Sequence, residues 1–443
     1  MMNAVGATPL IEQWSEAFRA VPQSAGPDWL QELRSEAARQ FGVSGLPNRK
    51  TETWKYTPLR LLEQQAPSIE AAASASPAND DLPQTVVSAS SGMVDILNGR
   101  LIGDLPETPP GLTLTPMADG FEAFGATLQR LLPAAELAGP ANAFTALNTA
   151  FLDQGLIVHV AENTDGGSLL LRWSRLAETS ARLDNFRLVV LLEAGAKFEL
   201  IEQFESAPDS RGVLNVVTQV ELAAGAQLGH VRVQRESEEA TLLTKTTVGQ
   251  AADSRYRYFG FDLGGGLVRH ELGALLAGEG ADTDINGAFV LDRKRHVDNH
   301  ISVDHAATGC SSSQFFRGVL GGASRGVFNG RALIRPGADG SSVRQSNANL
   351  LLSPLAEMDT KPELEIYADE VEASHGATVG QLDETAVFYM RTRGLSEDES
   401  RRILTAAFCH AVTERLEDRD FAERIAGMFD AAMPGGLDSA GER

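Results

Sequence analysis

LIVHVAE at residues 156–162 opens a series of short apolar segments that includes SLLLRWSR at 168–175, FRLVVLLEAG at 186–195, KFELIEQF at 197–204 and LNVVTQVELA at 214–223. Each segment either alternates apolar and polar residues or forms a short apolar run, and both patterns are typical of β-strands. Glycine and other small residues separate the segments, which indicates tight turns between them. The sequence therefore predicts a mainly β region that starts near residue 155.

The small-residue turns recur along this region with a weak period. EAGA at 193–196 is followed by AAGA at 223–226, GEGAD at 278–282 and PGAD at 336–339. A spacing of roughly 25–30 residues is typical of coils that stack on one another, as in a β-helix or another solenoid. A β-sandwich with regular turns is the alternative, although about 200 residues of strand without a helix is long for one sandwich. We therefore expect a β-helix.

Helical patterns lie on both sides of the β region. Apolar residues recur at helical spacing over 10–18 and 29–41. Near the other end, SEDE at 396–399 is a capping-box pattern ahead of a broad apolar stripe over 403–416. We expect three parts: a mostly helical region over 1–150 with a mobile linker near 66–92, a β-helix core over 151–380 and a C-terminal helical domain over 381–443.

The composition restricts the classes of partner and compartment. The chain has 443 residues and a net charge of −22, and so acidic a surface repels nucleic acid and anionic lipid. Its first residues lack the pattern of a signal peptide, and no run of about 18 apolar residues predicts a membrane span. With only two cysteines, Cys310 and Cys409, no disulfide framework is expected. We therefore expect a protein of the reducing cytoplasm.

Motifs for common enzymatic chemistry are missing from the sequence. It contains no GxxxxGK[ST] phosphate loop, no GxSxG nucleophile elbow and no HExxH zinc motif. We therefore expect a protein that is not an enzyme, and any ATP hydrolysis in its pathway has to be supplied by a partner.

The most conspicuous polar stretch runs from residue 292 to residue 305. If it forms a strand, alternation places His296, Asp298 and His300 on one face. Two imidazoles beside a carboxylate are a possible divalent metal site. A polar ladder that hydrogen-bonds between coils explains the same residues without a metal.

A second reading of this region is a solenoid enzyme that acts on carbohydrates. Such enzymes use carboxylates on the face of a coil. Asp282 and Asp284, with Asn286 beside them, are the candidate residues here.

The two cysteines and His375 are the remaining candidate iron ligands. Cys310 lies in the serine-rich stretch TGCSSSQFF, where a thiolate is able to bind iron, although a small residue at a coil corner explains it equally. Cys409 falls within an apolar stripe and is expected in the core. His375 lies in EASHGAT, near the end of the strand region, where an exposed neutral imidazole is able to bind iron. A hydrogen-bonded histidine in a turn is the alternative for His375.

Three stretches of the sequence resemble the SufB/SufD family of the SUF system, which assembles iron–sulfur clusters. They are NRKTETWKYTPL at 48–59, the segment 298–319 with its FFRGVL, and the long segment 324–394. The last of these contains TKPELEIYADEVEASHGATVGQLDE, which is similar to the SufD branch of the family rather than to SufB.

The resemblance implies a fold, a complex and a site. The fold is a right-handed parallel β-helix flanked by N-terminal and C-terminal helical segments. The complex contains SufB, which pairs with this chain through the β-helices, and the ATPase SufC, which docks on the C-terminal helices; a homodimer is implied as possible when SufB is absent.

In the implied site, a nascent iron–sulfur cluster forms between a SufB cysteine and the histidine that matches His375. Many relatives carry cysteine where this chain has Ala373, so His375 is the only ligand expected in the motif. FADH2 is associated with the complex in some relatives, and no motif for it is seen here.

Overall fold

The structure is a computed structural model that describes residues 9–20, 26–69, 84–85, 89–132, 139–176 and 180–433. Most of the linker expected near 66–92 lies outside these residues. The helices before the main strands are α1 (Pro9–Ala20), α2 (Asp28–Ser44), the short η1 (Glu52–Trp54), α3 (Arg60–Gln65), α4 (Met117–Ala123), α5 (Gly125–Leu131), η4 (Pro140–Asn142) and α6 (Ala143–Ala150). Three helices follow the strands: α7 (Glu384–Thr392), α8 (Glu397–Thr413) and α9 (Arg419–Ala432).

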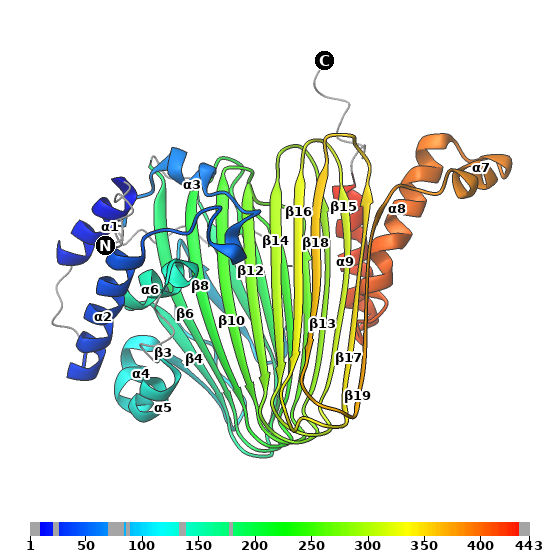
Figure 1. The fold of residues 1–443 in the computed structure, drawn as a ribbon. Coiled ribbons are helices and arrows are strands. Elements are labelled where there is room, and N and C mark those ends of the chain that lie inside the picture. Colours follow the sequence, from blue (N-terminus) through cyan, green and yellow to red (C-terminus); the bar gives the residue numbers. More distant parts are fainter. Residues whose placement is uncertain are drawn as a thin grey trace.

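The centre of the molecule is a parallel β-solenoid of about 7 turns, which confirms the β-helix expected from the turn spacing (Figure 1). From β4 onward, successive strands alternate between two sheets, and each pairs in parallel with the strand two places along the chain. The ten-stranded sheet contains β2 (Arg100–Ile102), β1 (Met93–Leu97), β5 (Asp165–Arg175), β7 (Lys197–Ser206), β9 (Gln227–Arg235), β11 (Arg255–Asp262), β13 (Asp282–Leu291), β15 (Ser311–Leu320), β17 (Ser341–Leu351) and β19 (Val371–Gly380). The nine-stranded sheet contains β3 (Leu112–Pro116), β4 (Gly155–Val160), β6 (Arg182–Leu192), β8 (Gly212–Leu222), β10 (Ala240–Gln250), β12 (Leu267–Leu276), β14 (His296–His305), β16 (Arg325–Ile334) and β18 (Glu357–Ile366).

The small-residue turns form one corner of the solenoid and hydrogen-bond to each other from coil to coil. The Gly195 N–H donates to Ala224 O at 2.9 Å, and the Gly225 N–H donates to Ala252 O at 2.9 Å. Both glycines have a left-handed backbone, with φ of 67° and 68°, which explains why small flexible residues recur there. The period seen in the sequence is thus the period of stacked corners.

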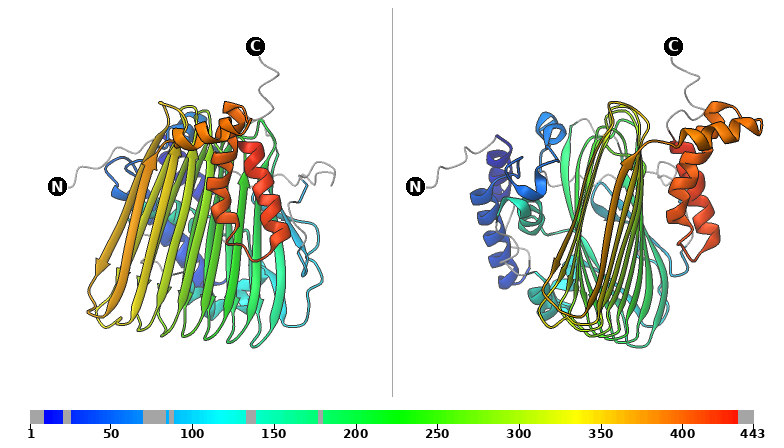
Figure 2. Two further views of the ribbon diagram at one scale, coloured as in Figure 1. Left: turned by 90° about the vertical axis from the view of Figure 1, so that its right-hand side faces the viewer. Right: turned by 45° about the vertical axis from the view of Figure 1, so that its right-hand side comes forward.

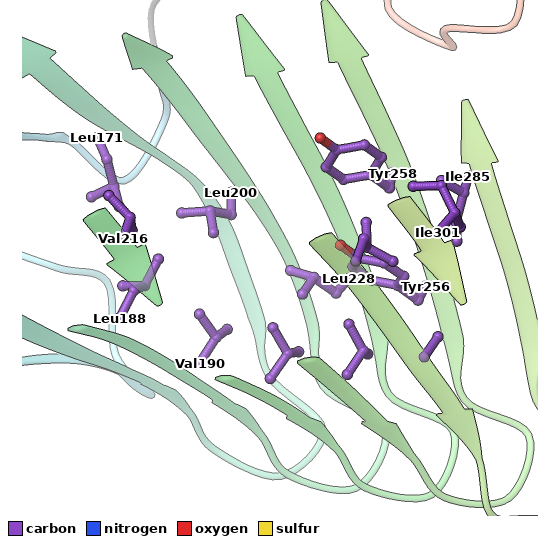
Figure 3. Close-up of a cluster of buried hydrophobic side chains, with 14 of the residues drawn as sticks. Leu171, Leu188, Val190, Leu200, Val216, Leu228, Tyr256, Tyr258, Ile285 and Ile301 are labelled. Carbon is purple, nitrogen blue, oxygen red and sulfur yellow. The ribbon is translucent and has the colours of Figure 1, made fainter. Parts of the chain in front are cut away.

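The main core lies between the two sheets, where inward-pointing apolar side chains of successive coils stack (Figure 3). Leu188 and Val216 of the nine-stranded sheet face Leu200 and Leu228 of the other. At about 25 cal/mol for each Å² of apolar surface buried, this continuous core is the largest stabilising contribution to the solenoid.

Helices cover the outer face of each sheet (Figures 1 and 2). Helices α1, α2 and α6 pack on the nine-stranded sheet through an apolar cluster that includes Leu183, Val213 and Leu243. Helices α8 and α9 pack on the ten-stranded sheet, where Phe429 meets the Phe261 ring edge-on at a centroid distance of 5.8 Å. The apolar stripe predicted over 403–416 is therefore used in part for intramolecular packing.

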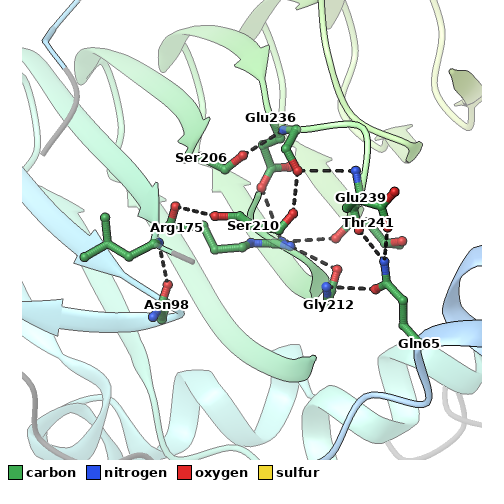
Figure 4. A network of polar contacts seen from close by, with 11 residues as sticks. Gln65, Asn98, Arg175, Ser206, Ser210, Gly212, Glu236, Glu239 and Thr241 are labelled. Carbon is green, nitrogen blue, oxygen red and sulfur yellow. Dashed lines mark hydrogen bonds and ion pairs between the residues drawn. The ribbon is translucent and has the colours of Figure 1, made fainter. Parts of the chain in front are cut away.

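A buried polar network ties α3 to one corner of the coils (Figure 4). Arg175 donates to Gly212 O at 3.0 Å and to Thr241 O at 3.1 Å, and its guanidinium lies 3.3 Å from Glu236. Gln65 of the helical segment accepts from the Gly212 N–H at 2.8 Å. These contacts provide hydrogen-bond partners for the backbone at this corner.

The two ends of the solenoid differ. At the N-terminal end, β2 pairs antiparallel with β1, and β3 pairs antiparallel with β4, so the first coil is covered. These short strands lie in a region that the sequence patterns predicted as mostly helical. At the other end, β18 and β19 are the outermost strands of their sheets, and they form one margin of the stack in the left view of Figure 2.

Candidate functional site

His375 lies in the middle of β19, in a strand rather than in the turn considered as an alternative. His375 is exposed to solvent, because β19 is the last strand of its sheet and no further strand covers it. Its register partner on β17 is Gln345, whose side chain reaches across the solenoid interior to Gly330 O at 3.0 Å. Since side chains that are register partners share a face, His375 belongs to the row that points toward the interior, at its open end.

The two open edges differ in chemistry. Strand β18 reads EMDTKPELEI, so it carries a proline and five charged residues. Strand β19 reads VEASHGATVG, in which Glu372 is the single carboxylate and no proline occurs. Proline and charge are the usual means of preventing edge-to-edge pairing. Of the two edges at this end, that of β19 therefore lacks the usual protection against pairing.

Exposed apolar side chains accompany the open end. Leu355, in the turn before β18, is 69% exposed, and Tyr367, directly after that strand, is 62% exposed. Ile366 and Val379 are exposed as well. A rim of such side chains around unpaired strand edges is typical of a protein–protein contact surface.

The predicted ladder of His296, Asp298 and His300 does lie on one face of β14, the outer face of the nine-stranded sheet. Asp298 is fully buried there and pairs with the guanidinium of Arg269. It also accepts a hydrogen bond from the Thr57 hydroxyl, and His300 Nε2 lies 3.1 Å from its Oδ1. These contacts join the N-terminal segment 48–59 to the solenoid.

The same segment is held by a second contact to Arg269. The guanidinium of Arg269 lies 4.0 Å from the centre of the Trp54 ring, and it donates to Glu271 at 2.7 Å. Burial alone would raise the pKa of Asp298, but the charge of Arg269 and the contacts with His300 and Thr57 hold it well below its usual range. The carboxylate is committed to an ion pair, which favours the structural reading of this ladder over a metal site.

Neither cysteine is placed where a reactive thiolate is expected. Cys310 is buried at a coil corner with its Sγ 3.3 Å from Gly278 O, and burial raises its pKa. Cys409 lies in the core between α8 and the ten-stranded sheet, as expected, and burial raises its pKa strongly. Both thiols are buried, and the raised pKa values disfavour the thiolate form.

The carboxylates considered for carbohydrate chemistry are engaged in packing. Asp284 lies 3.2 Å from Arg415, which follows α8. Asp282 accepts from the Ser311 hydroxyl and lies 3.8 Å from Arg255, while Asn286 is buried. The two carboxylates therefore have structural partners, as expected for charged residues on the outer face of a coil.

A second polar cluster lies inside the solenoid, which the sequence patterns did not predict. His230 Nε2 lies 2.8 Å from Glu202, and His270 Nε2 lies 3.0 Å from Asp262, which also pairs with Arg232 at 3.4 Å. All five side chains are buried. Burial lowers the pKa of His270 to about 4, so its ring is neutral at neutral pH. In the sequence, such a cluster could be recognised where a polar residue interrupts the row of inward-pointing apolar residues of a strand.

Among the described residues, no three His, Cys, Asp or Glu side chains gather into a group that would hold a metal ion. No helix in the described part of the chain is both long and apolar enough to cross a membrane. His375 is an exposed histidine at the open end.

Comparison with known proteins extends this description. The family model "SUF system FeS cluster assembly, SufBD core domain" matches residues 175–408, and the model "SufBD protein N-terminal region" matches residues 9–166. The iron–sulfur cluster assembly protein SufD of Escherichia coli is 30% identical over 98% of this chain and 100% of its own length. A SufBD family protein of Synechocystis is 28% identical over 87% of both chains, and the chloroplastic protein ABCI7 of Arabidopsis thaliana is 26% identical over 94% of this chain and 88% of its own.

The chain is a two-sheet parallel β-solenoid with helices packed on the outer face of each sheet. Within that class, the chain belongs to the SufBD family of iron–sulfur cluster assembly proteins, and it is of the SufD type. The resemblance seen in segments 48–59, 298–319 and 324–394 is thereby confirmed.

Replacing Asp298 by asparagine should lower the free energy of unfolding by about 3 kcal/mol or more at neutral pH, because Arg269 loses its buried counter-charge. Since folding lowers the pKa of Asp298, the stabilisation is present above the unfolded pKa of about 4 and is lost as the pH falls below it. Urea unfolding curves of the two proteins should therefore differ most at neutral pH and converge in acid.

Asp304→Asn is the matched control on the same face of β14. Asp304 pairs with Arg335 at 2.6 Å, and that pair is partly exposed to solvent. Its loss should change the free energy of unfolding by less than about 1 kcal/mol. Equal losses from the two substitutions would contradict the assignment of Asp298 as the buried anchor.

Proposed function

We propose that this chain is a non-catalytic SufD-type subunit whose open solenoid end pairs with a SufB-like solenoid to build an iron–sulfur cluster. The observation that carries the proposal is the unprotected edge of β19, which bears His375. An unpaired parallel edge leaves a row of backbone N–H and C=O groups without partners, and another strand satisfies them most completely.

The cluster is the substrate of this site, and His375 is the proposed ligand on this side of the seam. A neutral imidazole provides one nitrogen lone pair to iron. The neighbouring inward position of the same strand is Ala373, which has no ligating atom. The other ligands therefore come from the partner, in keeping with the burial of Cys310 and Cys409.

The C-terminal helices are the proposed docking site for the SufC-type ATPase. Helix α7 stands away from the solenoid in Figure 1, and Phe388 and Tyr389 on it are 65% and 58% exposed. Ile403 at the start of the α8 stripe is exposed as well. Exposed aromatic side chains on a projecting helix suit insertion into an apolar groove of a partner.

Ala377→Lys should prevent pairing with the SufB-like chain, because it places an inward-pointing charge on the β19 edge. Ala377 is exposed, so the isolated variant should keep the melting temperature of the parent. Copurification with the coexpressed partner measures the effect. Thr113→Lys, on the exposed position of β3 at the covered end, is the control that should still pair. Retained pairing of the Ala377 variant would exclude the β19 edge as the seam.

His375→Ala should leave the complex intact and reduce the yield of assembled cluster about ten-fold or more, which is the effect of losing a ligand-shell group. The yield is measured as iron and acid-labile sulfide bound per complex. His159→Ala is the control and should have no effect, because His159 is partly exposed on β4, far from the open end. A yield equal to that of the parent would remove His375 from the mechanism.

Phe388→Ala should weaken binding of the ATPase about ten-fold or more, as expected for an exposed aromatic anchor in a contact. The dissociation constant is measured with the purified complex and the separate ATPase. Val43→Ala, an equally exposed apolar residue at the end of α2, is the control. Unchanged affinity for the Phe388 variant would move the docking site away from α7.

A further inference from the structure

A column of polar side chains leads through the interior to His375. Gln314 on β15 is the register partner of Gln345 on β17, and Gln345 is the register partner of His375 on β19. Both glutamines point inward, and they are 1% and 5% exposed. The three side chains thus occupy one row on three successive coils, spaced by about 4.8 Å.

The orientation of the two carboxamides follows from their hydrogen bonds. Gln345 Nε2 donates to Gly330 O at 3.0 Å, and Gln314 Nε2 donates to Arg331 O at 3.5 Å. Because a carbonyl oxygen accepts only, the amide nitrogen has to face it, and each Oε1 is the atom left over. Neither Oε1 has a hydrogen-bond partner among the described residues, and both are buried.

A buried acceptor without a donor is uncommon and costs about 1–3 kcal/mol. Two other side-chain donors near the end of the column donate elsewhere. The Thr360 hydroxyl donates to Asn347 Oδ1 at 2.9 Å, and Asn349 Nδ2 donates to Asn347 Oδ1 and to Thr378 O. The next side chain in the row of Gln345 is the imidazole of His375, which in either neutral tautomer has one N–H.

We propose that Gln345 is a positioning residue that accepts the N–H of His375 through its vacant Oε1. This hydrogen bond fixes the plane and the tautomer of the imidazole, so that the second ring nitrogen presents its lone pair outward at the seam. Histidines that bind metals usually donate their other N–H to a fixed acceptor in this manner. The inference rests on the proposed function for the identity of the substrate, an iron–sulfur cluster. In the described part of the chain Gln345 Oε1 has no partner, and the hydrogen bond forms when the exposed imidazole of His375 turns its N–H toward that atom.

Gln314 supplies the comparison. It has the same side chain, the same inward row and the same unpartnered oxygen, but it lies two coils from His375, at about twice the strand spacing. If the glutamines affected His375 only through the packing of the interior, substitution of either one would change the tautomer ratio of His375 equally. Of the two glutamines, only Gln345 is the register partner of His375.

The test is the tautomer ratio of His375 in the full chain, measured by 15N NMR on protein labelled at histidine, at about pH 8, above the ordinary histidine pKa. The His375→Ala variant assigns the signal. The parent should show one dominant tautomer, and Gln345→Met should change the ratio about five-fold, the change that a neutral hydrogen bond of ordinary strength produces. Gln345→Glu, which keeps an acceptor, should retain the parent tautomer, and Gln314→Met should leave it unchanged.

A parent spectrum that shows the tautomer mixture of free imidazole would overturn the proposal without any variant. So would the same ratio in the parent and in Gln345→Met, or an equal change in Gln314→Met. The measurement needs no cluster and no partner. If His375→Ala left the cluster yield unchanged, the proposed function would fail while the tautomer result would stand, so the two failures are distinguishable.

Discussion

Each strand of this solenoid satisfies its backbone through the strand one coil away, and that requirement shapes the whole molecule. A stack built in this way always ends in an unpaired strand. At the N-terminal end the short antiparallel strands β2 and β3 cover the first coil and are themselves the outermost strands. At the other end β18 is protected by charge and proline, whereas β19 is not. The functional proposal follows from this difference, because an edge left open in a folded chain is the place where another chain is able to add.

The interior of the solenoid is not purely apolar. Ionised groups such as Asp262 and Arg232 are buried between the sheets, where an isolated charge would be very costly, and they pair with one another. Toward the open end the charged groups give way to the carboxamides of Gln314 and Gln345, which need hydrogen bonds but bring no charge. Neutral polar groups suit a place where water and a partner both approach, because their desolvation costs much less than that of ions.

Several features could be predicted from the sequence because they depend on local patterns. Two-residue alternation and the spacing of small-residue turns are consequences of strand geometry and of left-handed corners such as Gly195 and Gly225. The capping box at Ser396 and Glu399 is also local, and it forms as expected. By contrast, strands β1 and β3 were missed, since they are short and become strands only by joining sheets formed elsewhere in the chain. The same reason applies to the ion pair of Arg269 and Asp298, which are 29 residues apart.

The repeating coil, the flanking helices and the family membership could be predicted from the sequence, because alternation, turn residues and motifs are local patterns along the chain. Which distant residues come into contact depends on the folded structure. Thr57 and Asp298 lie 241 residues apart and share one hydrogen bond, and Gln345 becomes the neighbour of His375 through the register of two strands. The physical reason is that register is set by the packing of a whole coil on the next, and a shift of one residue would turn every side chain of the row to the opposite face.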